Sequence, residues 1–144
     1  MIRHAGLIAR KRQGRGCGVL IEGPSGAGKS DLALRALDQG FQLVADDRVL
    51  LWTAGGRLFG RAPDPLAGLL EVRGQGVAPL PFVAFCEVVL LAQAGEPERA
   101  PDSTTETILN VQVSRLLVDL LHASAPAKLG RALAAFDAAH KRRI

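Results

Sequence analysis

Residues 23–30 read Gly-Pro-Ser-Gly-Ala-Gly-Lys-Ser, which fits the phosphate-binding pattern G-x-x-x-x-G-K-S. Residues 17–21, Cys-Gly-Val-Leu-Ile, form a short apolar run in front of it, typical of a buried parallel strand. Behind it, residues 31–39 carry apolar side chains at helical spacing, and Gly40 offers a stop for that helix. Because strand, glycine loop and helix are the context that the motif requires, the sequence predicts a nucleoside triphosphate site.

The spacing within the motif explains its chemistry. Its glycines let the backbone curl so that successive N–H groups point at phosphate oxygens, and the start of the helix adds a positive dipole end. The lysine reaches the β- and γ-phosphates, and the final serine hydroxyl ligates Mg²⁺. The alternative is a glycine-rich turn that is followed by Lys-Ser by chance. The strand and helix patterns on either side of the motif make this alternative unfavourable. The predicted nucleotide-binding residues are Gly23, Pro24, Ser25, Gly26, Ala27, Gly28, Lys29 and Ser30.

Composition limits the class of protein. A chain of 144 residues suits one domain, and 48% apolar with 22% charged residues indicates a globular fold. No apolar run approaches the roughly 20 residues that cross a bilayer, and the N-terminus lacks the apolar stretch of a signal peptide. Cys17 and Cys86 both fall in expected strands, which favours buried thiols over a disulfide framework. We therefore expect a single domain over residues 1–144, no membrane association and a cytoplasmic location.

The net charge of +4 is modest, and the basic residues gather in residues 10–15 and 140–143. Such clusters are more often solvated surface or a patch for an acidic partner than a nucleic-acid site. With five Phe, one Trp and no Tyr, stacking on single-stranded nucleic acid has little support. We expect no nucleic-acid partner.

The rest of the chain reads as a strand-rich α/β domain. Apolar runs and turn signals predict an edge strand at 6–9, strands at 41–45, 69–73, 83–91 and 108–121, and a hairpin of 49–53 with 57–59 about Gly55-Gly56. Residues 93–105 read as a polar loop. Ser124 is placed to cap a final helix whose Leu129, Leu133 and Phe136 share one face. Because about fifty residues after the strand at 41–45 contain no helical pattern, the scaffold differs from the alternating sheet of ordinary nucleoside kinases.

Carboxylates follow two of these strands. Asp46 and Asp47 end the strand after the first helix, where open α/β sheets place their ligands, and one of them could accept a proton from an attacking hydroxyl. By strand alternation we expect Asp47 to point away from Asp46. Glu71 and Arg73 precede the turn Gly74-Gln-Gly76, and a carboxylate there could hold Mg²⁺ together with the loop serine. A surface turn at Asp46-Asp47 and a surface ion pair between Glu71 and Arg73 remain the alternatives.

Together these segments resemble the catalytic, C-terminal domain of the HPr kinase/phosphorylase family, which phosphorylates a serine of the phosphocarrier protein HPr in bacteria. The match runs in order through His4, the phosphate loop, Leu-Val-Ala-Asp-Asp-Arg-Val at 43–49 and Leu-Leu-Glu-Val-Arg-Gly-Gln-Gly-Val at 69–77. It is strong from Gly16 to Val77 and weak beyond. The loop alone is unspecific, but its combination with the two later segments is highly specific.

The resemblance implies a P-loop core similar to the nucleotide-binding core of phosphoenolpyruvate carboxykinase. It implies Asp46 as the base in phosphorylation, Lys29 as the residue holding the transferring phosphate, and His4 as support for the carboxylate. It also implies Ser30 and Glu71, with Asp47 beside them, as the Mg²⁺ site. Arg99 is the position that it assigns to a later arginine of the family.

Three departures from the family limit what the resemblance implies. We expect a short form without the usual N-terminal domain, Gln75 stands where the family signature usually has Leu, and the segment linked to phosphorolysis is not recognisable. We therefore expect a Mg²⁺-ATP-dependent serine kinase acting on HPr, with weak reverse phosphorolysis. The alternatives are a P-loop kinase for a small molecule and a non-catalytic nucleotide-binding regulatory module. Whether the chain forms a homo-oligomer is left open by the sequence.

Overall fold

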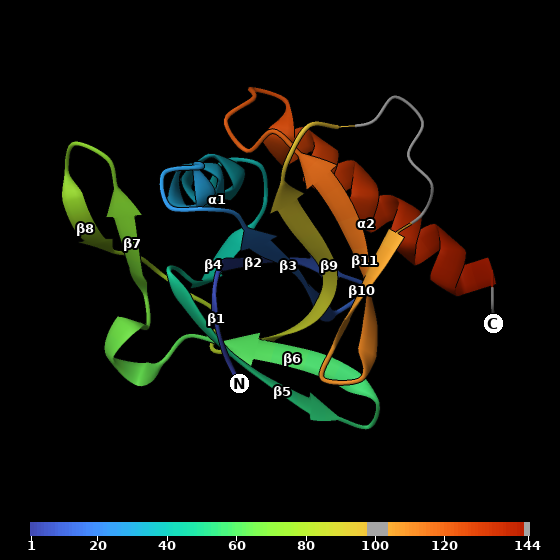
Figure 1. Cartoon of the computed structure of the whole chain (residues 1–144). Coiled ribbons are helices and arrows are strands. Elements are labelled where there is room, and N and C mark those ends of the chain that lie inside the picture. Colours follow the sequence, from blue (N-terminus) through green and yellow to red (C-terminus); the bar gives the residue numbers. More distant parts are fainter. Residues whose placement is uncertain (98–103, 143–144) are drawn as a thin grey trace.

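The structure, a computed structural model, describes residues 1–97 and 104–142 (Figure 1). Strands dominate this part of the chain, as the sequence predicts. They are β1 Ile2–His4, β2 Gly6–Arg12, β3 Arg15–Glu22, β4 Gln42–Ala45, β5 Arg48–Ala54, β6 Arg57–Arg61, β7 Leu69–Val72, β8 Gly76–Pro79, β9 Cys86–Ala94, β10 Thr104–Ile108 and β11 Val111–Val118. The helices of this part are α1 Lys29–Leu37 and α2 Ala125–Arg142, with a 3-10 turn, η1, at Asp64–Leu66.

One large sheet organises the described chain. Its strands follow the order β1-β5-β6-β9-β3-β2-β4, and the β10–β11 hairpin joins it through β11, which pairs with β9. Strand β9 runs parallel to both β3 and β11, whereas β2 runs antiparallel to β3 and to β4. Because β4 lies two antiparallel steps from β3, β3, β4, β9 and β11 all point the same way. The segments that follow these strands therefore meet at one end of the sheet.

The two faces of this sheet bury different cores. On one face α1 and α2 pack together, and Leu32 and Leu129 meet Val19 and Ile21 of β3 in a cluster of fully buried side chains. On the other face the sheet curls so that Leu20 of β3 meets residues of β2, β5, β6 and β9 in a second buried cluster (Figure 1). A strand buried on both faces needs a continuous apolar run, which explains the sequence of β3.

The hairpin of β5 and β6 confirms the predicted Gly-Gly turn. Gly55 and Gly56 adopt φ values of 58° and 75°, the left-handed conformations that a two-residue type I′ turn requires. The predicted turn after residues 69–73 is present as well. There β7 pairs with β8 in a separate two-stranded sheet that stands beside α1 (Figure 1). Strand β8 is not predicted by the sequence because its short, mostly exposed segment lacks an alternating apolar pattern.

Two strand predictions need correction. The edge strand predicted at 6–9 is an interior strand, because β4 pairs with the side of β2 that β3 leaves free. Residues 108–121, predicted as a single strand, instead contain the end of β10, a turn and β11, which ends at Val118. Leu109 and Asn110 adopt φ values of 49° and 67°, which reverse the chain between β10 and β11. The sequence does not reveal this turn, because Leu109 is an apolar residue of a kind that rarely adopts a left-handed turn conformation and it continues the apolar run.

The loop predicted at 93–105 is shorter at both ends, because β9 extends to Ala94 and β10 begins at Thr104, whereas other expectations are confirmed. Strand β9 pairs with strands on both of its sides, as a central strand should, although it begins and ends three residues later than predicted. Cys17 and Cys86 are buried thiols that are not joined in a disulfide. In α2, Leu129 and Leu133 are fully buried on one face. Neither helix in residues 1–97 and 104–142 combines the length and apolar character needed to span a membrane.

We expect Gly18→Ala to destabilise the sheet. A Cβ at Gly18 would lie 2.5 Å from Cys86 Sγ and 2.7 Å from the backbone oxygen of Glu87, where β3 and β9 approach each other closely. Such overpacking should lower the free energy of unfolding by about 1–3 kcal/mol, measured by urea denaturation. Gly16→Ala, on the same strand, is the control, since its Cβ would make an ordinary 3.6 Å contact with Cys86 Cβ. Equal stability of the two variants would contradict this close approach.

Candidate nucleotide-binding site

The glycine motif forms the loop between β3 and α1, at the end of the sheet where the parallel strands finish. Its turn is closed by the N–H of Ala27, which donates to the oxygen of Pro24 at 3.0 Å. Gly26 and Gly28 adopt φ values of 83° and 103°, which side chains with a Cβ rarely tolerate. Helix α1 begins at Lys29, immediately after the loop. The loop and the helix N-terminus thus adopt the arrangement that the motif predicts for binding phosphate.

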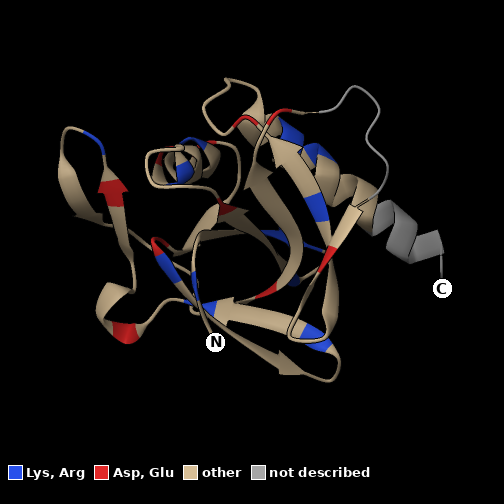
Figure 2. Cartoon of the chain, viewed as in Figure 1, with Lys and Arg blue, Asp and Glu red and all other residues tan. Residues whose placement is uncertain are grey.

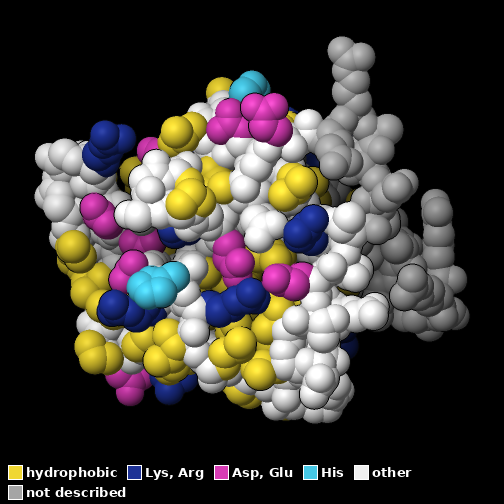
Figure 3. Space-filling model, in the orientation of Figure 1, with side chains coloured by type: hydrophobic (Ala, Val, Ile, Leu, Met, Phe, Trp, Pro, Cys, Tyr) yellow, Lys and Arg dark blue, Asp and Glu magenta, His cyan; other side chains and the backbone are white. Residues whose placement is uncertain are grey.

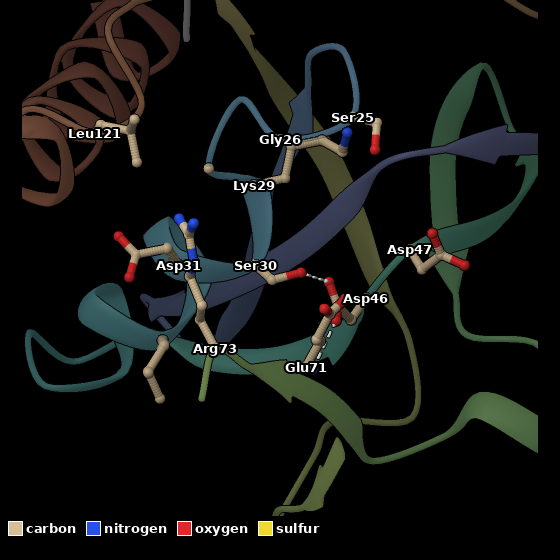
Figure 4. A pocket seen from close by; sticks show the side chains of 12 residues that line it. Ser25, Gly26, Lys29, Ser30, Asp31, Asp46, Asp47, Glu71, Arg73 and Leu121 are labelled. Atoms are coloured by element: carbon tan, nitrogen blue, oxygen red, sulfur yellow. Dashed lines mark hydrogen bonds between the residues drawn. The ribbon is translucent and has the colours of Figure 1, made fainter. Parts of the chain in front are cut away.

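The side chain of Lys29 folds back over this loop. Its Nζ donates to the oxygen of Gly23 at 2.6 Å and to the oxygen of Pro24 at 3.2 Å. These bonds hold the ammonium group at the mouth of the loop, beside the exposed backbone of Ser25 and Gly26 (Figure 4). A phosphate in the loop would therefore find a positive charge already in place.

Asp46 is the buried carboxylate of the site. It is 6% exposed and follows β4, so it lies at the same end of the sheet as the loop. Ser30 Oγ donates to Asp46 Oδ1 at 2.8 Å, and the backbone N–H of Glu71 donates to Asp46 Oδ2 at 3.0 Å (Figure 4). One carboxylate thus joins three segments that are distant in sequence: the start of α1, the end of β4 and strand β7.

Asp47 turns the other way. Its φ of 68° places it in the left-handed region, and its side chain is exposed on the far side of Asp46 from Ser30 (Figure 4). The opposite orientation of the two carboxylates agrees with the expectation from the sequence, but the cause differs. Strand β4 ends at Ala45, so a turn rather than strand alternation separates Asp46 from Asp47.

A cavity of about 540 Å³ connects these groups. Lys29 and Arg73 supply positive charge to its lining, and four carboxylates supply negative charge. In Figure 4 the Arg73 side chain reaches into the cavity from the β7–β8 hairpin. The full lining is Ser25, Gly26, Gly28, Lys29, Ser30, Asp31, Leu34, Asp46, Asp47, Glu71, Arg73 and Leu121.

Charges of both signs are also mixed over the rest of the described chain. Basic and acidic segments are scattered over the strands and helices (Figure 2), and basic and acidic side chains neighbour one another on the face seen in Figure 3. This face therefore presents no extended area of a single charge.

Some residues expected at the site do not line the cavity, namely His4 and, in the loop itself, Gly23, Pro24 and Ala27. His4 is exposed in β1 opposite Arg48 of β5. Its nearest link to the site is through the next residue, since the N–H of Ala5 donates to the backbone oxygen of Asp47 at 3.1 Å. Arg99 lies outside the described residues.

An ion pair at the end of β3, just before the loop, is not predicted by the sequence. Glu22, the last residue of β3, lies 3.1 Å from Arg3 Nε, and Arg3 also approaches Glu106 at 3.4 Å. Burial raises the pKa of Glu22, Arg3 opposes that rise, and Glu106 adds to it. Nothing in the local sequence links these three residues, because β1, β3 and β10 are brought together only by the curled sheet.

Arg35 and Leu121 were missed as well. Leu121 lines the cavity from the segment between β11 and α2, and Arg35 of α1 donates to backbone oxygens of the same segment. In the sequence, Arg35 belongs to no motif and Leu121 is the end of an apolar run. Their role depends on the parallel pairing of β11 with β9, which no local pattern reveals.

Known proteins match both the sequence and the fold. The model of the HPr Serine kinase C-terminal domain family matches residues 13–82. A HPr kinase/phosphorylase of Clostridium tetani is 47% identical over 75 residues, 52% of this chain and 25% of that protein. A HPr kinase/phosphorylase of Clostridium novyi is 35% identical over 119 residues, 73% of this chain and 39% of that protein.

A solved structure extends the match over nearly the whole chain. The Hpr(Ser) kinase/phosphatase from Coxiella burnetii superposes with a TM-score of 0.81 at 27% identity, covering 98% of this chain and 99% of that one. The chain thus matches that structure end to end, whereas its matched segments span 25% and 39% of the two clostridial proteins.

We expect Asp46→Ala to destabilise the protein in the absence of any nucleotide. The substitution leaves the N–H of Glu71 and the hydroxyl of Ser30 without their acceptor, which should cost about 1–3 kcal/mol of unfolding free energy. Urea denaturation measures this cost. Asp38→Ala is the control, because Asp38 is exposed at the C-terminal end of α1 and should change stability little. A loss at Asp46 no larger than at Asp38 would show that this carboxylate does not hold the three segments together.

Proposed function

Because this chain belongs to the HPr kinase/phosphorylase family, we propose that it is a Mg²⁺-ATP-dependent kinase that phosphorylates a serine of an HPr-like phosphocarrier protein. The observation that carries the proposal is the 2.8 Å hydrogen bond between Ser30 Oγ and Asp46 Oδ1. It puts the candidate metal-binding hydroxyl and the candidate base at one point, beside the phosphate loop.

In the proposed reaction Asp46 accepts the proton of the substrate serine hydroxyl. The serine oxygen forms a new bond to the γ-phosphorus while the bond from that phosphorus to the β–γ bridging oxygen breaks, and ADP leaves. Lys29 offsets the charge of the transferring phosphoryl group. To reach it, the Nζ exchanges at least one of its bonds to the loop oxygens of Gly23 and Pro24 for a phosphate oxygen.

The oxygen donors at the cavity fit Mg²⁺. Ser30 Oγ and the exposed carboxylates of Glu71 and Asp47 line the cavity and are hard ligands that would hold the ion. No group of three or more potential ligands among His, Cys, Asp and Glu occurs in residues 1–97 and 104–142, and a nucleotide site needs only one or two carboxylates beside the phosphates. Bound Mg²⁺ supplies charge neutralisation between the β- and γ-phosphates.

Several finer features belong to the same proposal. We propose that residues 1–144 form one catalytic domain with a P-loop core similar to that of phosphoenolpyruvate carboxykinase. His4 and Arg99 are proposed to assist catalysis, and reverse phosphorolysis is proposed to be weak. The absence of membrane and nucleic-acid partners and a cytoplasmic location stay predictions.

The direct test is incubation with labelled ATP, Mg²⁺ and an HPr-like phosphocarrier. We expect label on a serine of the carrier, and none when that serine is replaced by Ala. Lys29→Ala should abolish transfer because it removes the charge next to the phosphates, while the exposed loop leaves the fold intact. Label transferred to a small metabolite but not to the carrier would contradict the proposed substrate. Unimpaired transfer by Lys29→Ala would contradict the phosphate-loop assignment.

A second experiment separates the two aspartates. Asp46→Asn keeps the shape but loses the basicity, so single-turnover phosphorylation should slow by roughly 10²- to 10⁴-fold. Asp47→Asn, the matched variant, should cost less, because Asp47 is exposed and turned away from Ser30. ATP affinity should survive in both and is measured by calorimetry. If both variants lose activity equally, or if Asp47→Asn loses more, Asp46 is not the base.

A further inference from the structure

The cavity has two chemically different ends. Asp47 lies at one end and Leu121 at the other, with Lys29 and Ser30 between them (Figure 4). The large apolar side chains of its lining are Leu34 and Leu121, among residues that are otherwise small, polar or charged. Ligand pockets commonly combine a few polar groups with an apolar wall that covers the uncharged part of the ligand. The leucine end has no part in the phosphate chemistry described above.

Leu121 is an unusual surface residue. It is 60% exposed, although a leucine side chain gains free energy when it is covered. It nevertheless lies directly on the phosphate loop, since a Cβ at Gly28 would be 2.5 Å from Leu121 Cδ2. Gly28 therefore has two reasons to be glycine, its φ of 103° and the leucine above it. The contact places one side of Leu121 against the loop and leaves the other side open to the cavity.

Arg35 holds Leu121 in this place. From α1 its guanidinium donates to the backbone oxygens of Leu120 and, at 2.9 Å, of His122, the two neighbours of Leu121. Its Nε donates to Asp31 Oδ2 at 2.8 Å, which orients the guanidinium along the helix. Hydrogen bonds from a charged donor are stronger than neutral ones, so this clamp ties the segment after β11 to the helix that begins at the loop.

The direction of a bound triphosphate follows from the polar groups. The γ-phosphate belongs beside Asp46 and Lys29, and the chain of phosphates then passes over the N-terminus of α1. The nucleoside must leave on the side away from Asp46, which is the side where Leu121 lies (Figure 4). The exposed face of Leu121 is thus positioned to meet the base.

We propose that Leu121 forms the wall that packs against the nucleobase of the bound nucleoside triphosphate, and that Arg35 is the positioning residue for this wall. The inference rests on the proposed nucleotide-binding function and adds to it the site of the base. Because packing against an apolar leucine side chain lacks hydrogen-bond selectivity, the wall should accept adenine and guanine alike.

The experiment compares a ligand that has a base with one that lacks it. Calorimetry measures the affinity of the full chain for ATP and for inorganic tripolyphosphate, each with Mg²⁺. Leu121→Ala should weaken ATP roughly 5- to 20-fold, from the apolar area lost, and leave tripolyphosphate within about twofold. Leu109→Ala is the matched control, because Leu109 is an exposed leucine in the β10–β11 turn, outside the cavity.

The role of Arg35 is tested by a double-variant cycle. Arg35→Ala should weaken ATP but not tripolyphosphate, and the double variant with Leu121→Ala should lose little more than Leu121→Ala alone. Arg35→Lys, which keeps the charge but not the forked donors, should fall between wild type and Arg35→Ala. Additive losses would overturn the positioning role. Circular dichroism checks that each variant is folded.

The outcomes separate this inference from the function on which it rests. The base wall would be overturned if Leu121→Ala left the affinity for ATP unchanged, or if it weakened the affinities for ATP and tripolyphosphate equally. In either case, binding of tripolyphosphate by the wild-type chain would still support the phosphate loop. A rise only in the KM for the phosphocarrier would assign Leu121 to the acceptor instead and would also overturn it. A wild-type chain that binds neither ligand would overturn both proposals.

Discussion

The site depends on the common direction of β3, β4 and β11. Parallel pairing through β9 and the two antiparallel steps through β2 bring the ends of these strands to one edge of the sheet. The phosphate loop follows β3, Asp46 follows β4, and the Leu121 segment follows β11. If one of these strands ran the other way, its contribution would lie at the opposite end of the molecule, far from the other two.

Asp46 joins the segments that meet at this edge of the sheet through hydrogen bonds. A buried carboxylate is costly unless its oxygens accept hydrogen bonds, and here each oxygen accepts one. The donors come from α1 and from β7, so the same bonds that satisfy the carboxylate also fix the helix and the β7–β8 hairpin around the cavity. Asp46 therefore both holds these segments together and stands in position as the candidate base.

Close contacts around the phosphate loop limit which substitutions its glycines can tolerate. Gly23 would place a Cβ 2.8 Å from Ala94 Cβ at the end of β9, and Gly28 is covered by Leu121. The loop is thus packed against the ends of two strands as well as aimed at a ligand. The Glu22–Arg3 pair lies at the end of β3, directly before the loop in sequence, and both of its side chains are partly buried.

The sequence by itself determined the phosphate loop, the strand and helix around it, the hairpin at Gly55-Gly56 and the carboxylate at Asp46. These features are local: glycine spacing, apolar periodicity and turn residues act over a few neighbours along the chain. Only the tertiary structure decided that β2 lies inside the sheet and that residues 108–121 include the turn of a hairpin. It also brought Leu121, Arg35 and the Glu22–Arg3 pair to the site. These depend on strand pairing between distant segments, which side-chain patterns along one strand do not encode, because the same apolar alternation is compatible with several partners.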